Sequence, residues 1–310
     1  MNSETIALIV SLLYGIPSFV LYALILFQMI RPKYRKTFSN AFFRLCFAIG
    51  VVDCLGYLGF YIFFTLPMYS ITSPIFGSSL FAPSAFTTGI SFTLFVLLFL
   101  QIIGNCFLTL NRFTAVVIPF RHDKIWRFFF PISVVVTIVV SIAMCWEAST
   151  ATVLYSPLDG GYVLTQAIPN PGISFRILMT VFITCLLCLL LNAISAIFLV
   201  SCTSLHSVGK LERNFFFMAL IIFMVQGIHG IHELLFFIGL STENVSLVVI
   251  MNSMLPWLTD LKFLSPPWIF LIFSASIRRI VVQALPKRLS STNTPVININ
   301  ANTYSSKTEQ

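Results

Sequence analysis

The sequence predicts an all-α membrane protein, a seven-transmembrane helix bundle with its N-terminus outside and its C-terminus in the cytoplasm. Three observations predict it: the number of long apolar segments, the scarcity of charge, and the placement of Lys and Arg. The 310 residues are 58% hydrophobic and 9% charged, with a mean hydropathy of +0.96. A soluble domain carries charge on about a quarter of its residues. The bilayer is therefore the solvent in which this chain folds.

Seven apolar segments are long enough to span the hydrocarbon core, which takes about 20 helical residues. They are residues 6–30, 38–64, 85–110, 128–147, 173–201, 214–239 and 247–274. We expect one seven-helix domain, residues 1–279, followed by a cytoplasmic tail, residues 280–310. The tail is expected to be mostly disordered, because its Ser, Thr and Asn residues cannot form a core.

Cations are expected to lie on one side of the membrane. They occupy the gaps after the first, third and fifth helices and the tail: Arg31, Lys33, Arg35, Lys36, Arg112, Arg121, Lys124, Arg127, Lys210, Arg213, Arg278, Arg279, Lys287, Arg288 and Lys307. The alternate gaps, 65–84, 148–172 and 240–246, hold none. Short loops rich in Lys and Arg stay cytoplasmic. The net charge of +8 is thus a topology signal, and nucleic-acid binding, which needs one basic stripe, is not expected.

The loops expected outside carry one glycosylation sequon, Asn244-Val245-Ser246, so Asn244 is a candidate acceptor. No cysteine falls in these loops, where an oxidising compartment would favour a disulfide.

The end of the third segment, residues 110–121, is the most informative stretch. Arg112 follows Asn111 at the cytoplasmic mouth of a long apolar helix. One interpretation is a stop-transfer arginine with an apolar stem and a hydrated head. The other is functional, because the stretch resembles the Asp/Glu-Arg-Tyr segment of rhodopsin-like receptors in the aromatic Phe113, the Ala-Val pair and the later Pro119. We expect Pro119 to end the helix and shape the second inner loop.

The chain is more similar still to the nematode serpentine chemosensory receptors, specifically the gamma/V class. The shared features are Leu-Asn-Arg-Phe at 110–113, a Pro-Phe turn with a basic stretch and Trp at 119–126, Tyr-Gly-Ile-Pro-Ser at 14–18, and the segment 260–268. The resemblance covers about residues 14–279. It implies a G-protein-coupled chemosensory receptor, multi-pass in the plasma membrane, with a sensory cilium as the narrower expectation.

The resemblance also implies roles for single residues. In rhodopsin-like relatives the arginine that matches Arg112 contacts the G-protein alpha subunit when the sixth helix swings outward. Asn111 replaces the acid that restrains this arginine, so Glu212 is either a substitute partner or a solvated surface residue. The seventh helix has Pro266-Pro267 where those receptors have Asn-Pro-x-x-Tyr. We expect a kink there, either a static bend or a lever.

Four ionisable residues, Asp53, Glu233, Asp260 and Lys262, lie at membrane depth. Such residues face the bundle interior and are functional candidates. Lys262 is expected to pair with an acid. Asp260 is two residues away and points elsewhere on the helix, so Asp53 and Glu233 are equally plausible partners.

His229, His232 and Glu233 lie on one face in the outer half of the sixth helix. Polar packing between helices, a ligand pocket or proton-sensitive element, and a metal site remain open. No fourth metal ligand is evident, so we expect no metal and no other cofactor. Glu147 and Asp159 are expected to add negative potential at the pocket mouth, favouring a cationic or uncharged ligand.

These features predict a receptor that binds a small molecule among the outer halves of its helices and activates a heterotrimeric G protein inside. The alternative is a multi-pass transporter or ligand-gated channel, although a transporter usually shows repeated halves with broken helices. An enzyme is not expected, because no nucleophile and base line an aqueous cleft.

Overall fold

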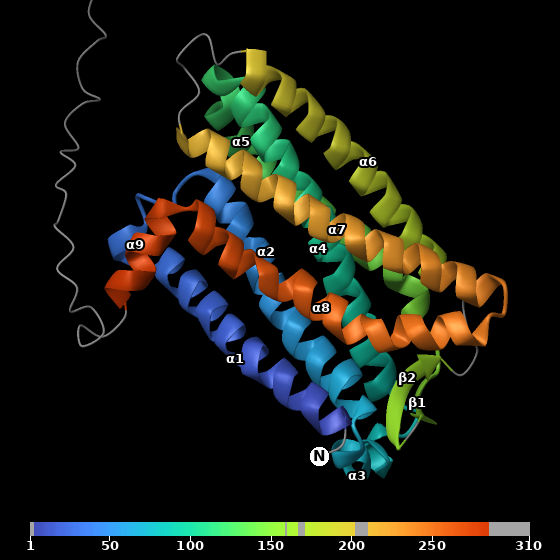
Figure 1. Ribbon diagram of the computed structural model, residues 1–310. Helices are drawn as coiled ribbons and strands as arrows, with labels where there is room; N and C mark the ends of the chain where they lie inside the picture. The colour runs from blue at the N-terminus through green and yellow to red at the C-terminus, as the bar shows by residue number, and fades with distance from the viewer. Residues whose placement is uncertain (1–2, 159, 167–170, 202–209, 285–310) are drawn as a thin grey trace, which may run out of the picture.

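The computed structural model describes residues 3–158, 160–166, 171–201 and 210–284. It is a tilted bundle of long helices (Figure 1). Seven helices within those ranges are long and apolar enough to cross a membrane, which confirms the predicted seven-helix fold. They are α1 (Ser3–Ile30), α2 (Ala41–Phe60), α4 (Ala85–Val117), α5 (Pro119–Cys145), α6 (Pro171–Ser201), α7 (Lys210–Ser241) and α8 (Val245–Phe273).

Three of these helices have a side-chain cap at their N-terminus, where a loop ends and an apolar segment begins. Asn40 accepts a hydrogen bond of 3.0 Å from the Phe43 amide at the start of α2, and Asn244 accepts one of 3.1 Å from Leu247 at the start of α8. Ser84 and Thr87 form a reciprocal capping box at the start of α4. Each cap satisfies a backbone N–H that the first helical turn leaves without a partner.

The connections at the two ends of the bundle differ. The N-terminus, the short helix α3 (Ser73–Phe76) and the strands β1 (Val153–Leu158) and β2 (Gly161–Gln166) lie at one end, which we call the hairpin end. The helix α9 (Ala275–Ala284) and the α4–α5 junction lie at the other, the α9 end. Short helical turns extend α2 (η2, Tyr61–Thr65, and η3, Leu66–Met68) and α5 (η6, Trp146–Ser149). Other single turns lie in the loops: η1 (Pro32–Tyr34), η4 (Ser70–Thr72) and η5 (Ser79–Phe81).

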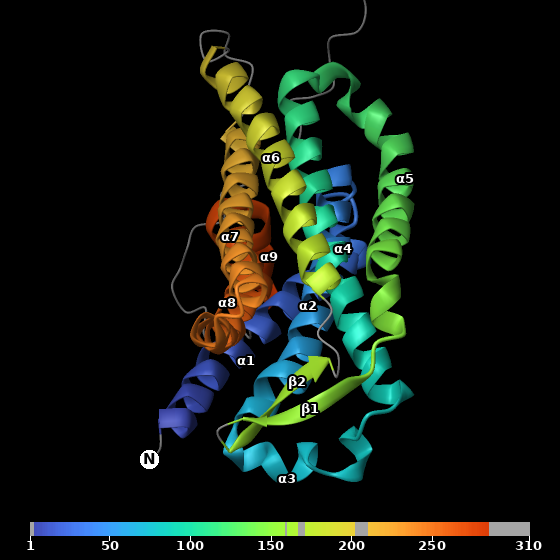
Figure 2. The same ribbon diagram turned by 90° about the vertical axis from the view of Figure 1, so that its right-hand side faces the viewer.

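The antiparallel hairpin of β1 and β2, with Val153 opposite Gln166, was not expected from the sequence. It lies across the ends of the helices in Figure 2. Alternate side chains of a strand point to one face, and Val153 and Tyr155 of β1 are buried with Phe76 and Phe81. The hairpin therefore has a small apolar core of its own on the bundle.

The α4–α5 junction is tighter than the predicted second inner loop. α4 ends at Val117 and α5 begins at Pro119, not at residue 128, so only Ile118 separates them. Proline suits the first position of a helix, where its missing N–H has no partner to lose. Trp126 is consequently buried in the junction and donates a hydrogen bond of 2.8 Å to Thr114 Oγ1.

The predicted boundary between the helix domain and the tail, at residues 279 and 280, falls inside a helix. Residues 280–284 belong to α9, an amphipathic helix that buries Ile277, Ile280 and Val281. Apolar residues three and four positions apart give a helix one apolar face. This face packs α9 against the bundle. Residues 285–310 lie outside the described part of the chain.

Candidate functional site

A cavity of about 480 Å³ opens among α2, α4, α6, α7 and α8 at the hairpin end. Most of its wall is apolar, with aromatic rings from Phe60, Phe64, Phe95, Phe236 and Phe263. The charged or titratable side chains in the wall are His229, His232, Glu233 and Lys262. A mainly apolar cavity of this size with a few convergent polar groups is typical of a small-molecule site.

The hairpin covers this cavity and contributes Val153 and Leu164 to its wall. Thr87 Oγ1 of α4 donates to the Val153 carbonyl at 3.2 Å, and Tyr155 Oη donates to the Phe63 carbonyl at 3.1 Å. Burial raises the pKa of the Tyr155 phenol, so the phenol keeps the proton that it donates. These bonds hold the hairpin without a disulfide in the described part of the chain.

Gly161 lets the hairpin pack closely against the backbone of η3. A Cβ at this position would lie 2.5 Å from the Met68 carbonyl oxygen and 2.8 Å from that of Pro67. Backbone atoms cannot move aside as a flexible side chain can. Glycine is thus required here for the close approach between β2 and η3.

His229, His232 and Glu233 come together in the cavity wall. Glu233 Oε1 lies 3.7 Å from His229 Nε2 and 3.4 Å from His232 Nδ1. His232 Nε2 lies 3.0 Å from the Met251 carbonyl, which can only accept, so this nitrogen carries the hydrogen. One ligand atom from each of the three residues lies within 4.8 Å of the others. Within the described ranges no fourth His, Cys, Asp or Glu joins them.

Lys262 does not form the ion pair expected from the sequence. Its Nζ is buried and has no hydrogen-bond partner among the described residues. Asp53 is fully buried and accepts from Tyr22 Oη at 2.7 Å and from Gln101 Nε2 at 2.6 Å. Neutral donors thus take the Asp53 oxygens, and no carboxylate of the described residues lies within ion-pair distance of the Lys262 Nζ.

Gln101 of α4 links the polar residues in the middle of the bundle. Its Nε2 also donates to the backbone carbonyl of Lys262 at 3.4 Å. That carbonyl loses its helical donor because Pro266, four residues on, has no N–H. Sequence reasoning missed Gln101 because it is uncharged; the available signal was a lone amide in an apolar helix.

Asp260 faces α1, away from Lys262, as its spacing predicted. It accepts hydrogen bonds from Ser11 Oγ at 3.3 Å and from Tyr14 Oη. One turn further along α1, Ser18 Oγ accepts from Trp268 Nε1 at 2.9 Å. The motifs at 14–18 and 260–268, far apart in sequence, are thus two sides of one helix contact.

Arg112 lies at the α9 end, buried at 3% exposure. Asn111 Oδ1 accepts from Arg112 Nε at 3.2 Å and from Nη2 at 2.5 Å. The guanidinium carbon lies 4.0 Å from the ring centroid of Phe42 and 5.2 Å from that of Phe215. Burial contradicts the stop-transfer interpretation, which needs a hydrated head. The side chain of Glu212 lies outside the described residues.

The α4–α5 junction beside Arg112 presents an exposed surface. Phe113 is half-buried, Pro119 is exposed and the Phe120 ring is fully exposed. Thr114 Oγ1 lies 3.1 Å from His122 Nδ1 and accepts from Trp126. This network fixes the start of α5, and with it the position of Phe120.

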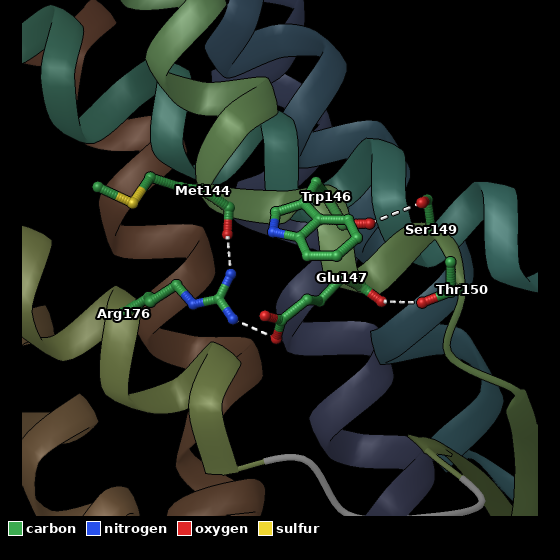
Figure 3. A network of polar contacts seen from close by, with 6 residues as sticks. All are labelled: Met144, Trp146, Glu147, Ser149, Thr150 and Arg176. Atoms are coloured by element: carbon green, nitrogen blue, oxygen red, sulfur yellow. Dashed lines mark hydrogen bonds and ion pairs between the residues drawn. The ribbon is translucent and has the colours of Figure 1, made fainter.

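Glu147 does not line the cavity. Figure 3 shows it paired with Arg176 of α6, whose Nη1 also donates to the Met144 carbonyl at 3.2 Å. Arg176 offsets the negative potential that the sequence assigned to the pocket mouth. Sequence reasoning missed Arg176 because it lies within an apolar segment. Asp159 lies outside the described residues.

Asn244 is exposed at the start of α8. Its Oδ1 serves as the helix cap, and its Nδ2, the atom that carries a glycan, is not used in that bond. Capping and glycosylation are therefore compatible at this residue.

Comparison with known proteins gives a family match over most of the chain. The model of a family described as "Srg family chemoreceptor" matches residues 8–281. "Serpentine receptor class gamma-31" of Caenorhabditis elegans is 26% identical over 310 residues, covering 95% of this chain and 97% of that protein. "Serpentine receptor class gamma-16" of the same organism is 27% identical over 183 residues, covering 57% of this chain and 54% of that protein.

Proposed function

Because this chain belongs to the Srg family of chemoreceptors, we propose that it binds a small chemical cue in the cavity and activates a heterotrimeric G protein. Family membership makes it a chemosensory receptor rather than an enzyme, and its seven apolar helices make it a multi-pass membrane protein. The proposal adds the position of the ligand, the coupling partner, and residence in the plasma membrane, with the sensory cilium as the narrower site.

The observation that carries the proposal is the separation of the cavity from Arg112 along one helix. Ser91, Phe95 and Leu98 of α4 line the cavity, and Arg112 lies near the other end of α4. A receptor needs such an arrangement, because the ligand and the intracellular partner must act on the same element from opposite sides of the bilayer. Cations cluster at the α9 end, which supports its placement in the cytoplasm.

The polar groups in the middle of the bundle support a switching role for α8. Asp53, Gln101 and the carbonyl of Lys262 are joined by hydrogen bonds, while Pro266 and Pro267 interrupt the helical bonds of α8 below the cavity. A ligand that contacts Lys262 would act on this network directly. In this proposal α8 is the lever and not a static bend.

The coupling surface in this proposal is the junction that carries Asn111, Arg112, Phe113, Pro119 and Phe120. A fully exposed phenyl ring beside a buried cation offers an apolar anchor for a partner. Release of Arg112 from Phe42, Phe215 and Asn111 would make a charged anchor available as well.

The test is expression of the full chain in cells with a calcium or cyclic-nucleotide reporter, challenged with a panel of small odorants. We expect a response that is lost in Arg112→Ala with unchanged surface delivery. The same cells without G-protein alpha subunits should not respond. A ligand-gated current that persists in those cells would replace the receptor proposal with a channel.

A further inference from the structure

Resting on the proposed receptor function, we propose that the cavity takes an apolar small molecule that bears a carboxylate, with Lys262 as the group that pairs with it. The side chain is 4% exposed and lines the cavity. Its Nζ has no hydrogen-bond acceptor in the described part of the chain. An ammonium at membrane depth is costly unless a counter-charge or an acceptor meets it.

The neighbouring acids contact other side chains and not Lys262 in the described part of the chain. Asp53 lies behind the cavity wall, where Tyr22 and Gln101 donate to it at 2.7 and 2.6 Å. Glu233 is the one carboxylate in the wall among the described lining residues, and two imidazoles contact it at 3.7 and 3.4 Å. The Phe263 ring, with its centroid 5.9 Å from Nζ, gives Lys262 only a weak cation–π contact. Lys262 is therefore a lining residue whose Nζ has no hydrogen-bond partner among the described residues and can pair with a charged group of a ligand.

The rest of the wall defines the ligand body. Aromatic and aliphatic residues from α2, α4, α6, α7 and α8 face the cavity. Apart from Glu233, Lys262 and two histidines, the polar lining residues carry hydroxyl groups or, at Asn252, an amide. An apolar chain or ring gains from burial against such a surface. His229, whose two ring nitrogens have no hydrogen-bond partner in the described structure, stands in the same wall as a second polar contact.

This assignment reverses the expectation of a cationic or uncharged ligand. That expectation depended on Glu147 and Asp159 at the pocket mouth. Arg176 pairs with Glu147 and so offsets one of the two negative charges on which that expectation depended. Lys262 lines the cavity without a hydrogen-bond partner among the described residues, and its charge is positive.

The experiment is equilibrium binding of radiolabelled octanoate to the purified full-length protein in detergent at pH 7.4. Unlabelled octanoate, methyl octanoate, 1-octanol and octylamine compete for the site. The variants are Lys262→Met, which keeps length and removes charge, and Lys262→Arg, which keeps charge. Lys33→Met, an exposed lysine in the first inner gap, is the matched control.

We expect octanoate to compete at least about tenfold better than the ester, the alcohol or the amine, since loss of a buried charge partner costs at least that much affinity. Lys262→Met should weaken octanoate by about tenfold or more and leave the ester unchanged, while Lys262→Arg and Lys33→Met retain the preference. Absence of saturable octanoate binding, equal competition by ester or amine, or full octanoate affinity in Lys262→Met overturns the inference. The ligand series on the unaltered protein tests the preference for a carboxylate even where a variant does not fold, and Lys262→Arg provides a second variant at the same position.

Failure here is separable from failure of the receptor function. Octanoate binding requires no G protein, so carboxylate binding without signalling would reject only the coupling. Reporter responses to amines or neutral odorants, with no gain from a carboxylate, would reject the Lys262 assignment and leave the receptor function standing.

Discussion

Gln101 Nε2 donates a hydrogen bond of 2.6 Å to Oδ1 of Asp53 and one of 3.4 Å to the backbone carbonyl of Lys262. One amide thus serves a buried carboxylate of α2 and a carbonyl that Pro266 leaves without a helical donor. Asp53 is fully buried inside the bundle, where a lost hydrogen-bond donor is costly. Gln101 is consequently the residue on which the polar centre of the bundle depends.

Gln101→Leu should lower the stability of the receptor, because it leaves the Asp53 oxygen and the Lys262 carbonyl without this donor. Loss of a partner for a buried polar group costs about 1–3 kcal/mol. Thermal unfolding of the detergent-solubilised protein, followed with a thiol-reactive dye on its buried free cysteines, measures the effect. Gln283→Leu, which removes an exposed bond with Tyr34, is the control; equal melting temperatures for the two variants would contradict the assignment.

Tyr14 and Asp260 should be energetically coupled across the α1–α8 contact. Tyr14→Phe removes a hydroxyl donor from a buried carboxylate, and hydrogen bonds to charged groups contribute about 1.5–3 kcal/mol. A double-mutant cycle with Asp260→Asn, measured by thermal unfolding, should give a coupling energy of about 0.5–3 kcal/mol. Tyr34→Phe with Asp260→Asn serves as the control pair and should be additive. Additive effects of Tyr14→Phe and Asp260→Asn would mean that the contact contributes no coupling.

Gly161→Ala should loosen the hairpin over the cavity. The added Cβ would meet the Met68 carbonyl at 2.5 Å, and overpacking of this kind costs about 1–3 kcal/mol. We expect faster amide hydrogen exchange in β1 and β2. Gly89→Ala, where a Cβ meets nothing within 4 Å, should leave the exchange unchanged. Unaltered hairpin protection in Gly161→Ala would show that the close approach is not needed.

Phe120→Ala should weaken coupling to the G protein without affecting folding, because the ring is fully exposed. Loss of an apolar anchor at an interface costs about 2 kcal/mol, roughly 30-fold in affinity. The measurement is ligand-stimulated nucleotide exchange on a purified G protein, with surface delivery and melting temperature checked in parallel. Phe128→Ala, at an exposed phenyl ring further along α5, is the matched control. Full coupling by Phe120→Ala would remove the junction from the proposed interface.

Epitope tags at the two termini should face opposite compartments, since seven crossings separate them. In unpermeabilised cells we expect antibody staining of an N-terminal tag and none of a C-terminal tag, with both stained after permeabilisation. Staining of both tags, or of neither, before permeabilisation would be inconsistent with seven crossings.

The sequence determined the number of spans and their approximate limits, because apolar length is a local property that each segment carries by itself. It also brought His229, His232 and Glu233 to one face, since helical spacing decides which neighbours on a single helix meet. The same spacing separated Asp260 from Lys262, as the structure bears out. The receptor-like motifs resemble the family on residues that lie in four different helices, α1, α4, α5 and α8.

Only the tertiary structure decided which residues of different helices meet. The partners of Asp53, the pairing of Glu147 with Arg176, and the aromatic contacts of Arg112 depend on how each helix is rotated and where it crosses its neighbours. No single segment encodes those quantities, because they result from packing the whole bundle at once. For the same reason the sequence did not predict the hairpin. Its short strands gain stability by burying Val153 and Tyr155 against the bundle. The lack of an ion pair at Lys262 among the described residues likewise emerged only from the placement of Asp53 and Glu233.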